Sequence, residues 1–122
     1  MPPADPRPAR RVKDPALLKA LHREWTECAL RHLPDGCAHR LSLHHIHKHR
    51  DDMRPNLVML CGSGTTGHHG LVEAHDPPTL RALYRYLSAY RPDTLRYLAE
   101  HLGSPERAGE WLTRTLLTRK VA

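Results

Sequence analysis

Residues 41–73 read LSLHHIHKHRDDMRPNLVMLCGSGTTGHHGLVE, and this stretch decides the fold. Its two largely apolar runs, 41–47 and 56–60, are typical of short strands, whereas the connector between them is too polar to pack. A glycine-rich loop follows, and the residues from His68 onward are compatible with one or two turns of helix. The stretch therefore predicts a pair of strands followed by a short helix.

Histidine and carboxylate side chains on these elements suit a metal ion. Successive side chains of a strand point to opposite faces, so His44 and His45 would face different neighbours. His69 and Glu73 are four residues apart, which places both on one face of a helix. A strand histidine facing this pair would form a catalytic metal site with open positions for water and a substrate oxygen.

A second and separate site is predicted from sulfur ligands. Cys28 and Cys37 precede the strands, while Cys61 and His68 bracket the glycine loop. Four such ligands are the number that a structural zinc ion requires. Neighbouring residues at the start of a helix diverge, so His68 could face the zinc while His69 faces the catalytic metal.

The glycine loop also allows a different interpretation. Gly62, Gly64 and Gly67 satisfy G-x-G-x-x-G, the spacing of a dinucleotide-binding loop, which would indicate a nucleotide-dependent oxidoreductase. That fold needs a βαβ unit and an acidic residue about 20 positions further on. The chain downstream of the loop is helical by pattern, so we expect no nucleotide cofactor.

Composition indicates the class of partner. The chain has 122 residues, a formal net charge of +6 and a pI near 9.7, which favours an anionic partner, with nucleic acid ahead of membrane. No apolar run approaches the ~18 residues that span a bilayer, and the N-terminus lacks the apolar core of a signal peptide. Three cysteines are an odd number for a disulfide framework. We therefore expect a soluble, cytoplasmic protein without a membrane partner.

The rest of the chain predicts a helix-rich α+β fold in three parts. Residues 1–13 form a flexible basic arm, 14–76 the core, and 77–122 a helical extension. Asp14 and Pro15 start a helix over 15–27, Gly103 ends a later one, and Ser104-Pro105 opens another. The extension faintly resembles a helix-turn-helix, but its second helix is not especially basic. A helical cap is favoured, packed on the core or on a second subunit in a homodimer.

The ordered motifs resemble a known family. HHI, an Asn-Leu-x-x-Leu-Cys strand and a histidine at the start of a helix look like the HNH endonucleases, over about residues 25–75. The wide first cysteine pair and the CGSGTTG loop resemble small phage-encoded members. The resemblance implies a ββα-metal finger, braced here by zinc, that hydrolyses DNA with one divalent cation. It also implies a phage or mobile-element protein acting in the cytoplasm of a bacterial host cell.

The resemblance assigns roles by motif position. His44 and His69 would be metal ligands, and His45 the general base that takes a proton from the attacking water. Asn56 would fix the hairpin and orient His45, while Glu73 would be a further ligand or would position water.

The cation follows from the ligand types. Mg²⁺ or Mn²⁺ is favoured, and two histidine ligands leave Ni²⁺ and Zn²⁺ open. Relatives usually have Cys-His after the glycine loop, where this chain has His68-His69. Because histidine also binds zinc, the change is compatible with a Cys3His site.

The function predicted from the sequence is a metal-dependent DNA endonuclease that nicks DNA or cuts both strands. Lys48, Arg50 and Arg54 in the connector, and Arg10 and Arg11 in the arm, are the predicted DNA contacts. The alternative is a zinc-braced DNA-binding module with an inactive catalytic site.

Overall fold

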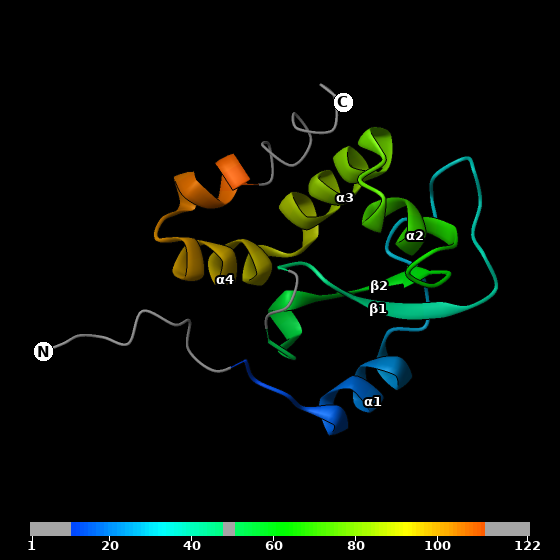
Figure 1. Ribbon diagram of the computed structural model, residues 1–122, viewed down its shortest axis with the longest axis horizontal. Coiled ribbons are helices and arrows are strands. Elements are labelled where there is room, and N and C mark those ends of the chain that lie inside the picture. The colour runs from blue at the N-terminus through cyan, green and yellow to red at the C-terminus, as the bar shows by residue number, and fades with distance from the viewer. Residues whose placement is uncertain (1–10, 48–50, 112–122) are drawn as a thin grey trace, which may run out of the picture.

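The computed structural model describes residues 11–47 and 51–111 (Figure 1). It has an α+β architecture with the element order α1 (Pro15–Glu24), β1 (Leu41–His45), η1 (Arg54–Asn56), β2 (Leu57–Cys61), α2 (Gly67–Glu73), α3 (Pro77–Tyr90) and α4 (Pro92–Leu102). Within the described ranges, none of the helices combines the length and the apolar character needed to cross a membrane. Ten residues of the predicted arm, 1–10, lie outside those ranges.

The strands β1 and β2 form one antiparallel pair, in which His45 lies opposite Leu57. Both strands are close to the predicted runs, although β1 stops two residues earlier and β2 starts one residue later. The difference arises at Asn56, which belongs to the 3-10 turn η1. Even so, the Ile46 N–H donates to the Asn56 carbonyl at 2.8 Å, so the ladder extends one pair beyond the strands.

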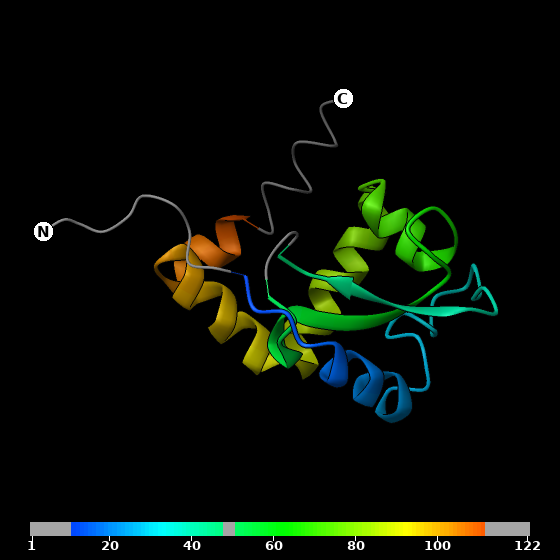
Figure 2. The ribbon, with the colours of Figure 1, turned by 60° about the horizontal axis from the view of Figure 1, so that its bottom comes forward.

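Helix α1 lies on the opposite side of the strand pair from α2 (Figures 1 and 2). It begins as predicted, because the Asp14 carboxylate caps it by accepting from Leu17 N at 3.1 Å. It ends at Glu24 and not at residue 27. The chain leaves the helix there to run beside β2, where Ala29 N donates to the Met59 carbonyl at 2.9 Å.

The glycine loop makes a tight turn between β2 and α2. Gly62 has φ 89° and Gly67 has φ 63°, a region that side chains other than glycine rarely adopt. A Cβ atom at Gly62 would collide with the Thr66 carbonyl, and one at Gly67 would lie 2.5 Å from the Cys61 carbonyl oxygen. The glycines therefore allow His68 to return to the end of β2, where its N–H donates to Cys61 Sγ at 3.3 Å.

The C-terminal helices share the core of the strand pair. Leu83 and Leu87 of α3 and Leu98 of α4 belong to the same buried cluster as Val58 and Leu60 of β2. Gly103, at φ 105°, ends α4 as predicted, and residues 105–111 are helical. Residues 77–111 of the extension thus pack on the core, which is one of the two arrangements predicted for it.

Candidate metal centres

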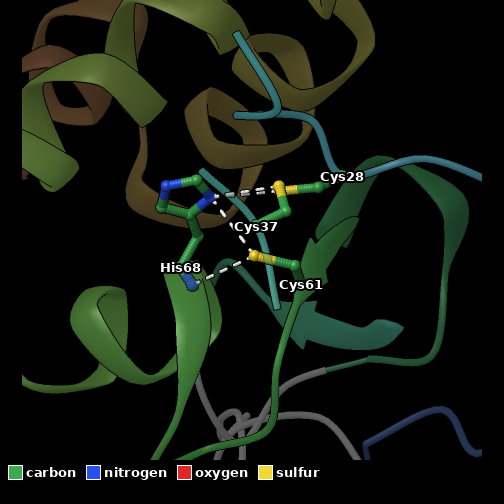
Figure 3. A group of neighbouring side chains, drawn as sticks. All are labelled: Cys28, Cys37, Cys61 and His68. Carbon is green, nitrogen blue, oxygen red and sulfur yellow. Dashed lines mark hydrogen bonds between the residues drawn. The ribbon is translucent and has the colours of Figure 1, made fainter. Parts of the chain in front are cut away.

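Three cysteines and one histidine converge at the start of α2. The sulfur atoms of Cys28, Cys61 and Cys37 lie 3.4, 3.3 and 3.7 Å from Nδ1 of His68. Figure 3 shows the sulfur atoms gathered on the Nδ1 side of this imidazole. The four predicted zinc ligands therefore meet, although they come from three separate segments of the chain.

Distances within this Cys3His group fit a tetrahedral metal ion. One imidazole nitrogen carries a single lone pair or a single proton, so it cannot bond to three sulfur atoms at once. A zinc ion with bonds of about 2.3 Å to sulfur and 2.0–2.1 Å to nitrogen would hold sulfur and nitrogen about 3.6 Å apart. The observed separations scatter around that value, so this group could hold a structural zinc ion.

Neighbouring groups support the same interpretation. Nε2 of His68 lies 2.8 Å from the Asp35 carboxylate, which orients Nδ1 toward the sulfur atoms. Burial and the neighbouring thiols raise the pKa of Cys37 to about 12. Burial also acts to raise the pKa of Cys61, but hydrogen bonds from backbone N–H groups outweigh this effect, and the pKa of Cys61 is lowered. Three adjacent thiols resist losing their protons together, and a cation between them would remove that resistance.

A second group joins β1 to the other side of α2. Nδ1 of His44 lies 3.1 Å from Oε2 of Glu73, and Nε2 of His69 lies 3.4 Å from the same oxygen. The two imidazole rings meet edge to face, with centroids 5.2 Å apart. The structure therefore brings together the three residues predicted as catalytic metal ligands.

The chemistry of this second group also fits a divalent cation. Ligand atoms bonded at about 2.0–2.2 Å to one ion lie about 3.0–3.5 Å apart, and the two nitrogen–oxygen distances to Glu73 fall in this range. Burial lowers the pKa of His44 to about 4, although the Glu73 carboxylate opposes the shift. His44 is therefore neutral at pH 7, which is the form of imidazole that binds metal ions. Three protein ligands would leave further positions for water or substrate.

Ser42 fixes the orientation of His69, a role that was not predicted from the sequence. The Ser42 hydroxyl donates its only proton to the Gly62 carbonyl at 2.7 Å. Its 2.5 Å contact with Nδ1 of His69 must then be donated by the imidazole. That tautomer leaves the lone pair on Nε2, which faces Glu73. The alternation of side chains along a strand could have indicated this role, because Ser42 precedes His44 by two residues and lies on the same strand face.

His45 contacts an aspartate and not the asparagine predicted to orient it. Its Nε2 lies 2.8 Å from Oδ1 of Asp52. The Asn56 side chain instead accepts from His47 N at 2.7 Å and donates to the Asp51 carbonyl at 2.9 Å. Asn56 thus links His47 to Asp51, while the ring contact of His45 belongs to Asp52.

The predicted DNA contacts fall into two groups. Lys48, Arg50 and Arg10 lie outside the described residues. Arg11 is exposed, whereas Arg54 makes a bidentate ion pair with Glu24 of α1, with distances of 2.6 and 2.7 Å. Arg54 is therefore engaged in a contact within the protein that the sequence did not indicate.

No protein-family model, curated protein or solved structure matches this chain.

Proposed function

We propose that this chain is a metal-dependent DNA endonuclease of the HNH family. The convergence of His44 of β1 with His69 and Glu73 of α2, beside His45, is the observation that carries the proposal. In this interpretation β1, β2 and α2 form a ββα-metal finger. The Cys3His group would hold a structural zinc ion that fixes the start of α2.

The proposed reaction is hydrolysis of a phosphodiester, which is anionic and has a poor leaving group. A divalent cation held by His44, His69 and Glu73 would supply a Lewis acid that offsets the negative charge of the transition state. Burial of His44 keeps its imidazole neutral and able to bind that cation. Ser42 holds the lone pair of His69 toward the same place.

His45 is the proposed general base. Its side chain is 25% exposed, which gives water and substrate access that the buried His44 lacks. A neutral imidazole can accept a proton at cellular pH. His45 would take that proton from the water that attacks phosphorus.

DNA is the proposed substrate because of charge. The net charge of +6 favours a polyanion, and the predicted arm carries Arg7, Arg10 and Arg11. If the arm contacts phosphates, deletion of residues 1–10 should flatten the salt dependence of DNA binding. An unchanged slope would remove the arm from the interface.

A plasmid assay tests the proposal. Supercoiled DNA is incubated with the zinc-loaded protein and Mg²⁺, Mn²⁺ or Ni²⁺, with EDTA as the control. We expect relaxed or linear DNA, and we expect His45→Ala to lower the rate by at least a hundredfold while DNA binding persists. The matched control is His75→Ala, which replaces a histidine that lies after the end of α2.

Two outcomes would contradict the proposal. Wild-type rates in His45→Ala would exclude His45 as the general base. DNA binding without cleavage under every cation would instead favour the zinc-braced DNA-binding module.

A further inference from the structure

Asp52 is a buried carboxylate that connects the proposed base to the N-terminal segment. Its side chain is 7% exposed, and Oδ1 lies 2.8 Å from Nε2 of His45. Its other oxygen, Oδ2, accepts from the backbone N–H of Asp14 at 2.9 Å. Each carboxylate oxygen therefore has its own partner.

Residues 12–14 hydrogen-bond to Asp52 and to its neighbour Asp51. The Asp52 N–H donates to the Val12 carbonyl at 2.8 Å, and Val12 N donates to Oδ1 of Asp51 at 2.7 Å. Asp51 also accepts from the Tyr97 hydroxyl of α4 at 2.7 Å. The connector is thus tied to the N-terminal segment and to α4, and Asp52 has little freedom to move.

The charge of Asp52 determines which nitrogen of His45 is protonated. Burial acts to raise the pKa of Asp52, but the hydrogen bonds from His45 and from Asp14 N outweigh it and lower this pKa. An ionised carboxylate only accepts hydrogen bonds. Nε2 of His45 must therefore carry the proton, which leaves the lone pair on Nδ1.

We propose that Asp52, held by residues 12–14, is a positioning residue that fixes the tautomer and the ring orientation of His45. It presents Nδ1 as the atom that accepts the proton. This inference rests on the proposed role of His45 and adds the N-terminal segment to the site. The segment would then contribute to the catalytic rate and not only to DNA affinity.

Asp52→Asn is the informative substitution because asparagine has the same shape but only one oxygen. If that oxygen accepts from Asp14 N, the amide NH₂ faces His45 and can only donate to Nε2. The imidazole then carries its proton on Nδ1 and cannot act as the base there. The same change in the aspartate of the serine protease triad imposes a wrong tautomer in this way.

The tautomer can be measured without any cleavage. Long-range ¹H–¹⁵N correlation spectra of the zinc-loaded protein at pH 8 report the protonated nitrogen of each histidine, and His45→Ala identifies the His45 signals. We expect the Nε2–H form in the wild type and the Nδ1–H form in Asp52→Asn. An Nδ1–H wild type, or the same tautomer in both proteins, would overturn the proposal.

Kinetics separates positioning from a merely structural role. We expect Asp52→Asn to lower kcat by about a hundredfold while KM for plasmid DNA stays within about twofold. Asp51→Asn is the matched control, because Asp51 contacts Val12 and Tyr97, and it should lower the Tm while keeping the wild-type tautomer. Equal losses of kcat in both variants, with the tautomer unchanged, would make Asp52 structural. A wild type that cleaves nothing would refute the proposed function, while the spectra would still decide the role of Asp52.

Discussion

The two candidate metal centres differ in what the protein supplies. The Cys3His group offers four ligands, which fill a tetrahedron, and three of them come from thiols. The group of His44, His69 and Glu73 offers only three, all nitrogen or oxygen. If both groups bind metal ions, the first would be a closed, structural centre and the second an open centre with positions left for water. Two adjacent histidines of α2 belong to different groups, because His68 lies in the Cys3His group and His69 lies in the group with His44 and Glu73.

The largest effect is expected from opening the closed centre. Cys28→Ser should abolish zinc binding and unfold much of the domain, because Cys28 joins the segment after α1 to the start of α2. Structural zinc in small peptides contributes about 10–16 kcal/mol of apparent binding free energy. Zinc content by mass spectrometry and circular dichroism would check this. A folded, zinc-free variant would contradict the structural role.

His69→Ala should leave zinc binding intact and lower only the rate of cleavage. It removes a ligand of the open centre, so we expect cleavage to fall at least a thousandfold while zinc content stays at one per chain. Plasmid cleavage and metal analysis of one preparation would provide both readouts. Loss of zinc in this variant would show that the two centres are not separable.

In protein to which no second cation has been added, lowering the pH should reduce the stability of the fold through His44 of the open centre. The pKa of His44 is about 4 in the folded chain and about 6.5 when unfolded, so only the unfolded state gains a proton between these values. This contribution to stability is complete above pH 6.5 and is lost as the pH falls toward 4, by on the order of 3 kcal/mol. Urea unfolding of wild type and His44→Asn at pH 7 and pH 5 tests it. The wild type should lose more stability than the variant, and equal losses would contradict the expected burial.

The smallest effect is expected from Ser42→Ala. Without the hydroxyl, His69 can adopt either tautomer, so Mn²⁺ affinity at the open centre should fall about tenfold to a hundredfold. Calorimetric titration of the zinc-loaded protein measures this, and Ser42→Thr should restore much of the affinity because it keeps the hydroxyl. If alanine and threonine behave alike, the hydroxyl does not orient His69.

Residue spacing predicted that His44, His69 and Glu73 meet, because the periods of strands and helices are regular. The i, i+4 pair His69 and Glu73 needed only a helix, and His44 needed only a strand facing it. The contacts of Asp52 and Ser42 could not be predicted in this way. Asp52 contacts His45 from a position outside the strands and helices, and Ser42 acts through a carbonyl that the Gly62 turn places beside it. The early end of α1 was missed for a similar reason, since the backbone becomes extended at Trp25 and Ala29 then pairs with Met59.

Because His68 and His69 are neighbours on a helix of only seven residues, the order of metal loading should be built into the chain. Residues 67–73 have too few turns to be stable alone, so the helix depends on what holds its first turn. Zinc at His68 would order that turn, and only then would His69 and Glu73 face His44. Newly made protein should therefore acquire zinc first and its second cation afterwards. Zinc-depleted chains given Mn²⁺ alone should remain inactive until zinc is supplied.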